Sequence, residues 1–277
     1  MASIVTSKDR KIEFGEGLPT AVIGERINPT GKKKLAEDLS QGKLDVLIQE
    51  ALSQKEAGAD ILDVNVAASG VDEITMLPKA VLKVLEVSGL PVCIDSSNPE
   101  ALRKALEVYP YKALVNSVTG QEKSLKAVLP LIKKFGASIV GLTMDDSGIP
   151  KTADKRFDVA KRIIEAAESY TIPKEDIVID CLCLAQAAET NSAVVILEAL
   201  TMVSRELGVA TVLGVSNISF GMPDRKIINL SFLAQAISQG LNAAIVDPTM
   251  EGMVETILAS DFLAGRDSHG KRYLKYY

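Results

Sequence analysis

The stretch Val92-Cys93-Ile94-Asp95, followed by Asn98-Pro99, indicates the fold class of this chain. A short run that is apolar throughout is typical of a strand buried on both faces of a parallel sheet, and here it ends in a carboxylate. Asn98 has the side chain of a helix cap, and Pro99 suits the first helical turn. The stretch therefore predicts a strand, a short polar connection and a helix, which together make one β/α unit.

The same pattern occurs eight times along the 277 residues. The ends of successive runs lie about 32 residues apart on average, which is the size of one β/α unit with its loops. Eight such units predict an α/β fold, namely a (β/α)8 barrel that forms one domain over residues 1–277, with residues 1–18 as an N-terminal extension at its base. The runs are Ala21–Gly24, Ile61–Val64, Val92–Asp95, Ala113–Asn116, Ser138–Leu142, Ile177–Asp180, Thr211–Gly214 and Ala243–Val246. Segments of helical periodicity lie between them, among them 44–57, 158–169, 192–207 and 226–239.

The composition excludes several classes of protein. Lys and Arg number 31 against 36 Asp and Glu, a formal charge of −5, whereas a nucleic-acid-binding surface needs a basic excess. No run approaches the roughly 18 apolar residues of a membrane span, and Met1–Gly17 lacks the apolar block of a signal peptide. Cys93, Cys181 and Cys183 lie in or beside apolar runs and are expected to be reduced thiols. We therefore expect a cytoplasmic protein with no nucleic-acid or membrane partner.

Polar residues end nearly every predicted strand. Barrel enzymes build their sites from the loops after the C-terminal ends of the strands, so these side chains are expected to meet at one end of the barrel. Asp and Asn are also common in turns and helix caps, so a structural role stays open for any single one. Four of them nevertheless stand inside their strands: Asp63, Asp95, Asn116 and Asp180. The whole rim comprises Glu25, Arg26, Asn28, Asp63, Asn65, Asp95, Ser96, Asn116, Ser117, Thr143, Asp145, Asp146, Asp180, Ser216, Asn217, Asp247 and Thr249.

The residue types on this rim favour one kind of ligand. Carboxylates and amides accept hydrogen bonds from ring N–H and amino groups, which suits a flat, neutral, nitrogen-rich ring. A phosphate is disfavoured because no Gly-rich loop follows the seventh or eighth strand. A zinc site and His-dependent nucleophilic catalysis are disfavoured because the single histidine, His269, lies in a polar tail. An oxygen-ligated Mg²⁺ at Asp145 and Asp146 stays open.

Five motifs at or near the ends of predicted strands are Val22–Gly31, Asp60–Asn65, Ile94–Ser96, Val115–Ser117 and Gly214–Ser219. In this order they resemble the pterin-binding barrel methyltransferases, above all the methyltetrahydrofolate:corrinoid protein methyltransferases, a group that includes the folate module of cobalamin-dependent methionine synthase. The resemblance covers nearly the whole chain. It implies a barrel like that of dihydropteroate synthase, and an enzyme that moves a methyl group between N5 of tetrahydrofolate and the cobalt of a corrinoid protein, in either direction.

The resemblance also implies roles for individual residues. The residues matching Asp95, Asn116 and Asp180 hold the pterin ring through its amino group and ring nitrogens, and the asparagine matching Asn217 hydrogen-bonds near N5. Such an amide can support developing charge at N5 without titrating, and Asn217 is the expected catalytic residue. The source of the N5 proton is left open, with water as a candidate. Further folate-binding residues on these motifs are expected to be Asp63, Asn65, Asn28, Ser216 and Ser219.

The substrates implied are tetrahydrofolate and 5-methyltetrahydrofolate, with the cobalamin carried by a partner protein. Corrinoid-carrying proteins of this system use an Asp-x-His-x-x-Gly pattern; Asp267 and His269 have its spacing, but Arg272 stands where the glycine would be. The resemblance further implies a homodimer. Three cations stay open as contacts for the glutamate tail of the folate: Arg26, Lys151 and Arg225.

Two alternatives stay open. The first is dihydropteroate synthase, a sister family with the same barrel and pterin pocket, but its Ser-Thr-Arg-Pro-Gly loop is replaced by Ala67–Val71 and its basic residue after the seventh strand by Asn217. The second is a barrel that binds folate without turning it over, as a subunit of a methyl-transfer complex. Asn217 argues against it, because a pure binder has no evident need of a group at N5.

Overall fold

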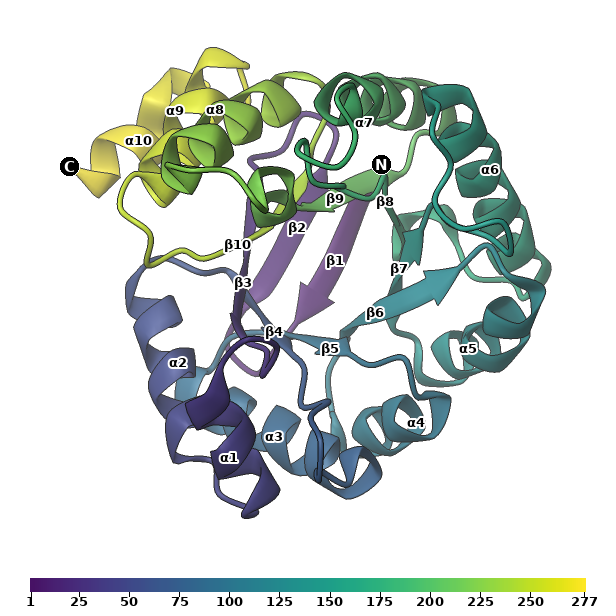
Figure 1. The fold of residues 1–277 in the computed structure, drawn as a ribbon, viewed down its shortest axis with the longest axis vertical. Coiled ribbons are helices and arrows are strands. Elements are labelled where there is room, and N and C mark those ends of the chain that lie inside the picture. The colour runs from purple at the N-terminus through teal and green to yellow at the C-terminus, as the bar shows by residue number, and fades with distance from the viewer.

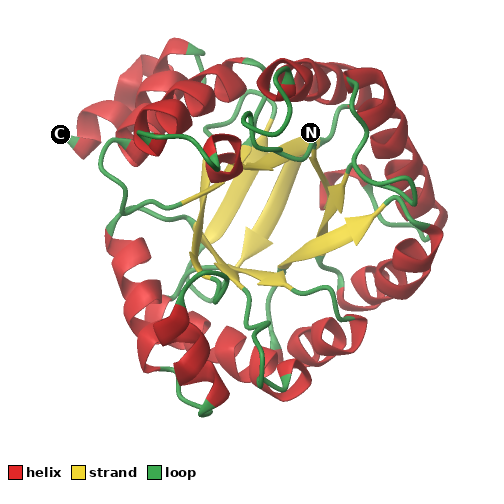
Figure 2. Cartoon of the chain, viewed as in Figure 1, coloured by secondary structure: helices red, strands yellow, loops and turns green.

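The computed structural model describes residues 1–277 and contains a closed barrel of eight parallel strands. The strand order around the barrel is β10-β3-β4-β5-β6-β7-β8-β9, so each strand neighbours the next in sequence and the last closes onto the first. All eight predicted strands are confirmed, and Figure 2 shows them inside a ring of helices. The strands are β3 (Ala21–Ile27), β4 (Ile61–Val64), β5 (Val92–Asp95), β6 (Leu114–Thr119), β7 (Ser138–Leu142), β8 (Ile177–Asp180), β9 (Ala210–Gly214) and β10 (Ala243–Val246).

The helices cover the outer face of the barrel and return the chain to its base (Figure 1). The expected cap at Asn98 is confirmed, since its side chain accepts hydrogen bonds from the backbone of Glu100 and Ala101. The α-helices are α1 (Lys33–Ser40), α2 (Asp45–Glu56), α3 (Glu73–Ser88), α4 (Pro99–Val108), α5 (Glu122–Phe135), α6 (Ala153–Ser169), α7 (Ser192–Met202), α8 (Arg225–Ser238), α9 (Met253–Leu263) and α10 (Lys271–Tyr276). Shorter helical turns are η1 (Lys174–Asp176), η2 (Val203–Leu207), η3 (Val215–Ser219) and η4 (Ser268–Gly270). None of these helices has the length and apolar composition that crossing a membrane requires.

Strand alternation separates two apolar cores. A large cluster of 60 buried residues fills the space between the sheet and the helices, and a smaller cluster of 13 fills the barrel. In β4, for example, Ile61 belongs to the inner cluster whereas Leu62 and Val64 belong to the outer one. Both faces of each strand are therefore buried, which explains why the strands are apolar throughout rather than alternating.

An antiparallel hairpin closes the N-terminal end of the barrel. It consists of β1 (Ala2–Thr6) and β2 (Lys11–Gly15), and Figure 1 shows it across the barrel. Val5 and Phe14 of the hairpin are fully buried in the inner cluster, and the backbone N–H of Thr6 donates to the carbonyl of Lys112 at 2.9 Å. The hairpin leaves the opposite end, where the strands finish, as the open mouth of the barrel.

Candidate functional site

The inward-facing side chains change from apolar to polar toward the mouth. Successive residues of a strand face opposite sides, so the residue two positions after an inward apolar residue also faces inward. Asp63 follows the inward Ile61 in this way, and five other strands repeat the arrangement, whereas β7 and β9 carry Leu142 and Gly214 at this position. We refer to the resulting set as the inner polar layer; it consists of Glu25, Asp63, Asp95, Asn116, Asp180 and Asp247.

Asp63 and Asp95 lie on adjacent strands and interact with two asparagines. The Nδ2 of Asn65 donates to Asp95 Oδ2 at 2.9 Å, and the Nδ2 of Asn116 lies 3.5 Å from Asp63 Oδ1. Burial raises the pKa of Asp63 well above its ordinary value, and repulsion from Asp95 raises it further. Burial also raises the pKa of Asp95 to about 6, although the Asn65 hydrogen bond opposes the shift. Burial and their mutual repulsion therefore favour the protonated form of the pair.

Asp180 faces this pair across the barrel. Its strand, β8, lies four strands from β4 in either direction around the sheet. One carboxylate oxygen accepts the backbone N–H of Leu182 at 2.7 Å, and burial raises the pKa of Asp180 to about 7. Asp180 and the Asp63–Asp95 pair thus offer hydrogen-bonding groups from opposite walls of the barrel.

The loop after β8 is held by a fully buried arginine. Arg156 of α6 is 1% exposed, and its guanidinium donates to the backbone carbonyls of Cys181 and Leu182 at 2.7 and 2.8 Å. Leu182 has a positive φ of 59°, a conformation that non-glycine residues seldom adopt. These contacts fix the backbone amide that binds Asp180.

The short helix η3 brings Asn217 to the mouth. Asn217 is exposed, and a Cβ on Gly214 would lie 3.2 Å from its Nδ2, so a glycine at the end of β9 leaves room for the amide. Ser216 Oγ donates to Glu25 Oε1 at 2.7 Å, which connects η3 to β3. Ser219 Oγ accepts from Arg225 Nε at 2.9 Å. Of the three predicted residues on this loop, Asn217 is the exposed one.

The loop after β3 gives its predicted residue a local contact. Asn28 Oδ1 accepts the backbone N–H of Thr30 at 3.0 Å, which is a turn-forming hydrogen bond. Behind it, the buried side chain of Gln54 accepts the backbone N–H of Arg26 at 2.8 Å. A Cβ on Gly24 would lie 2.4 Å from that Gln54 oxygen, so a larger residue here would displace the Gln54 side chain. A role for Asn28 in folate binding stays a prediction.

The three cations considered for the folate tail all have partners. Arg26 pairs with Glu50 at 2.9 Å and with Asp247 at 3.1 Å, and Lys151 pairs with Glu189 at 2.8 Å. Arg225 donates to the carbonyl of Ser216 and lies over the Phe220 ring, 4.5 Å from its centroid. The geometry does not single out one of them.

No cluster of three or more metal-ligating side chains occurs in the structure. Asp145, one of the two aspartates considered for Mg²⁺, accepts a hydrogen bond from the Ser147 hydroxyl and pairs with Arg162 at 3.3 Å.

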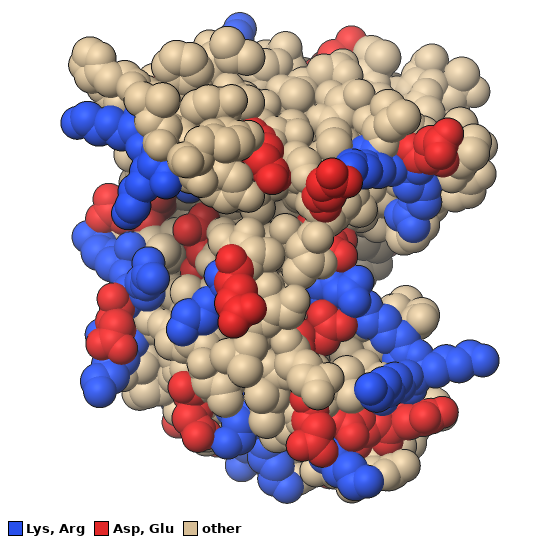
Figure 3. Space-filling model, turned by 90° about the vertical axis from the view of Figure 1, so that its left-hand side faces the viewer, with Lys and Arg blue, Asp and Glu red and all other residues tan.

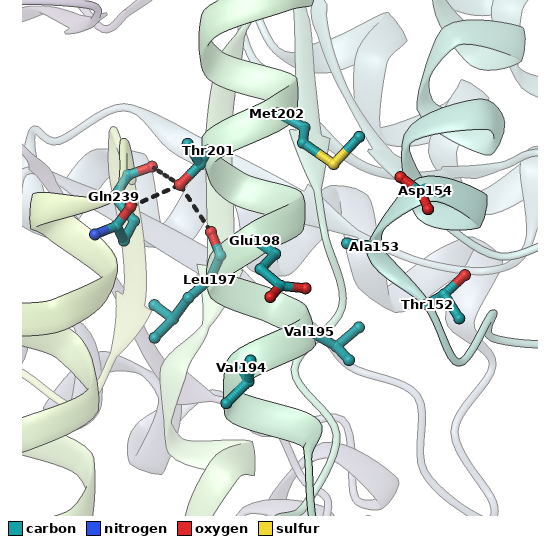
Figure 4. A pocket seen from close by; sticks show the side chains of 10 residues that line it. All are labelled: Thr152, Ala153, Asp154, Val194, Val195, Leu197, Glu198, Thr201, Met202 and Gln239. Atoms are coloured by element: carbon teal, nitrogen blue, oxygen red, sulfur yellow. Dashed lines mark hydrogen bonds between the residues drawn. The ribbon is translucent and has the colours of Figure 1, made fainter.

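A groove of about 630 Å³ lies on the outer ring of helices, away from the mouth. It runs between α6 and α7, and Figure 4 shows Glu198 and Asp154 on its two sides, with Thr201 hydrogen-bonded to Gln239. Because it contains none of the inner polar layer, the groove is not part of the site.

A family comparison accounts for this arrangement. Residues 24–247 match the family described as pterin binding enzyme. This chain belongs to that family. The matched range begins within β3, at Gly24, and reaches Asp247, and so includes the whole inner polar layer.

Two curated relatives cover most of this pterin-binding chain. The methylcorrinoid:tetrahydrofolate methyltransferase of Eubacterium limosum is 32% identical over 263 residues, which is 92% of this chain and 94% of that protein. The methionine synthase of Mycobacterium leprae is 30% identical over 87% of this chain, but the match spans only 21% of the larger protein.

Solved structures of dihydropteroate synthases share the fold. The enzyme from Xanthomonas albilineans superposes with a TM-score of 0.70 at 18% identity, over 95% of this chain and 98% of that one. The enzyme from Clostridium difficile gives a TM-score of 0.70 at 22% identity, over 90% and 98%. These identities support the barrel fold and not a shared activity. The predicted fold is confirmed, and the pterin-binding methyltransferase resemblance agrees with the family and the relatives.

The sequence did not predict the roles of two residues at the site. The sequence places Glu25 among many rim residues without marking it as a ligand contact. Its position two residues after Ile23 nevertheless indicates an inward side chain. Arg156 gave no signal, because a basic residue on an amphipathic helix is expected to face solvent. Only the structure shows it reaching the β8 loop.

Proposed function

We propose that this chain moves a methyl group between N5 of tetrahydrofolate and the cobalt of a corrinoid carried by a separate protein. The observation that carries the proposal is the inner polar layer at the barrel mouth, where carboxylates and amides stand on opposite walls. A pterin offers an amino group and several ring nitrogens, which need acceptors and donors in one plane. The name of the Eubacterium limosum relative supports the two substrates.

In this proposal Asp95, Asn116 and Asp180 hold the ring, with Asp63 and Asn65 beside them. Burial is the main cause of the raised pKa values of Asp95 and Asp180, and each carboxylate accepts one hydrogen bond from the protein. The N–H groups of a pterin supply further donors, so binding should favour the ionised carboxylates. Asn28, Ser216 and Ser219 remain candidates for more distant folate contacts.

Asn217 acts at N5. When a methyl group leaves N5, the C–N electron pair returns to nitrogen, and a tertiary amine leaves poorly without a hydrogen bond or a proton. An amide that is exposed at the mouth and has room above Gly214 can supply the hydrogen bond. Because an amide does not titrate, the proton itself must come from another group.

The corrinoid protein must reach the mouth, because that is where N5 would lie. The name of the Eubacterium limosum relative puts the methyl group on the corrinoid at the start of its reaction, and we propose that direction as the first to test here. We also propose a homodimer, to be checked by light scattering. A cytoplasmic setting agrees with three cysteines that are buried as free thiols.

The decisive experiment is a spectroscopic assay of methyl transfer. Methylcobalamin with tetrahydrofolate, and cob(I)alamin with 5-methyltetrahydrofolate, are each mixed with the protein, and the visible spectrum of the corrinoid reports the reaction. We expect spectral conversion that depends on folate, and the faster of the two reactions gives the preferred direction.

Two results would favour the alternatives. Condensation of a pterin pyrophosphate with 4-aminobenzoate, without corrinoid conversion, would assign the chain to dihydropteroate synthase chemistry. Tight folate binding with no conversion in either direction, even with a corrinoid protein as substrate, would make it a binding subunit.

A further inference from the structure

Glu25 is a carboxyl group at the mouth that the assigned ring contacts leave without a function. It extends from β3 and accepts a hydrogen bond from Ser216 Oγ at 2.7 Å. Ser216 is followed directly by Asn217, the residue assigned to N5. The Ser216 hydrogen bond therefore ties Glu25 to the helical turn that carries Asn217.

The surroundings of Glu25 favour the protonated form of its carboxyl group. Burial raises the pKa of Glu25 above its ordinary value, and Asp247 of the neighbouring β10 loop raises it further. Asp63, on the other neighbouring strand, adds a second carboxylate nearby. The Ser216 hydrogen bond and the charges of Lys32 and Arg225 act in the opposite direction. Glu50 of α2 is already paired with Arg26, so it contributes little free charge.

The other titratable groups are less suited to exchange a proton at N5. Asp95 and Asp180 are assigned to the ring, and burial raises the pKa values of Cys181 and Cys183 far above neutrality. His269 lies in η4, in the C-terminal segment outside the barrel. Glu25 is the carboxyl group that is linked to the Asn217 loop and is not required for the ring.

We propose that Glu25 is the proton acceptor and donor for N5. This rests on the proposed methyl transfer. In the folate-methylating direction, the N5 lone pair forms the bond to the methyl carbon, the cobalt–carbon pair stays on cobalt, and the Glu25 carboxylate takes the proton that N5 then loses. In the reverse direction, protonated Glu25 gives that proton to N5 as the C–N bond breaks and its electron pair returns to nitrogen. Asn217 hydrogen-bonds to N5 in both directions.

The test compares Glu25→Gln with the wild type in single-turnover methyl transfer between pH 5 and 9. The wild-type rate should rise with pH in the folate-methylating direction, because the carboxylate form is needed, and fall with pH in reverse. Glu25→Gln should lower the plateau rate about 100-fold or more and remove the pH dependence, while folate affinity changes by less than about threefold. Glu251→Gln, which alters an exposed rim carboxylate paired with Lys226, is the matched control and should keep the wild-type profile.

Two further variants keep the proposal open to refutation. Glu25→Asp retains a carboxyl group, so it should keep a titrating profile at a reduced rate even if Glu25→Gln folds poorly. Ser216→Ala removes a hydrogen bond that lowers the Glu25 pKa, so its midpoint should move to higher pH. A wild-type profile in Glu25→Gln, or a flat one in a folded Glu25→Asp, would overturn the proposal. A wild type that transfers no methyl group would instead refute the proposed function.

Discussion

Asp261 at the N-terminal end of the barrel and Asp180 at the mouth are both buried carboxylates, but the protein surrounds them differently. Asp261 accepts the backbone N–H and the hydroxyl of Thr20 at 2.8 and 2.7 Å, and Arg266 and Arg272 lie within 4.0 Å of it. Asp180 accepts one backbone N–H at 2.7 Å. The nearby Arg156 donates its hydrogen bonds to backbone carbonyl groups instead.

The same contrast recurs at further residues of the two ends. At the closed end, Tyr109 donates to the Thr6 carbonyl and accepts from the Val92 N–H, and Ser138 donates to Asp176. At the mouth, Asp63 has Asp95 as its charged neighbour. Polar groups that satisfy one another stabilise a fold, whereas buried carboxylates short of donors are stabilised by a ligand that brings them. This contrast is consistent with a closed end that stabilises the fold and a mouth that binds the proposed folate.

The largest effect is expected from breaking the closed end. Asp261→Ala would leave the Thr20 donors and two arginines without their acceptor, so we expect the free energy of unfolding to fall by about 3–5 kcal/mol in urea denaturation. Methyl transfer per folded molecule should be unchanged. Asp9→Ala, at an exposed position of the hairpin turn, is the control and should change stability by less than about 0.5 kcal/mol. A comparable loss of stability in both variants would contradict the special stabilising role of Asp261.

The opposite pattern is expected at Asn217. Asn217→Ala should slow methyl transfer by about 100-fold to 1,000-fold, because the hydrogen bond to N5 matters most as charge develops. Folate affinity should change by less than about threefold, and stability should be unaffected, since the side chain is exposed. Stopped-flow spectra and equilibrium folate titration measure the two quantities. Normal transfer in this variant would remove Asn217 from the reaction.

The two ends also differ in how well the sequence predicts them. The mouth is largely predictable from the sequence, because the alternation of side chains along a strand places Asp63, Asp95 and Asp180 inward once their strands are recognised. The closed end is not, because its contacts join distant segments: Asp261 and Thr20 are 241 residues apart in the chain. The sequence likewise predicts an N-terminal extension at the base but not the hairpin that buries Val5 and Phe14.

A smaller effect, on folate affinity, is expected from the two aspartates assigned to the pterin ring. Asp95→Ala and Asp180→Ala should each weaken folate binding by about 1–3 kcal/mol, or roughly fivefold to 150-fold, because pterin N–H groups would lose their acceptors. Asp146→Ala, at an exposed rim position, is the control and should bind folate normally. Isothermal titration at one pH measures all three. Unchanged affinity in both ring variants would mean that the ring lies elsewhere in the mouth.

The smallest expected effect is the loss of stability caused by the buried charge of Asp180. Asp180 has a pKa of about 7 in the folded protein, mainly because it is buried, whereas an aspartate in an unfolded chain has a pKa of about 3.9. Between these two pH values the folded state holds a proton that the unfolded state has released. The stability from this group is therefore complete below about pH 4 and is lost as the pH rises through 7.

Asp180→Asn keeps an acceptor for the Leu182 N–H without a charge. Its free energy of unfolding should therefore exceed that of the wild type by about 1–2 kcal/mol at pH 8, and the gain should disappear toward pH 4. Asp261→Asn, measured in the same urea series, should be destabilised at both pH values, because Asp261 accepts two hydrogen bonds from Thr20 and lies beside two arginines. Burial raises the pKa of Asp261 too, but these partners oppose the shift. Equal pH dependence in the two variants would mean that the protein itself compensates the charge of Asp180, and a ligand would then not be needed to explain that carboxylate.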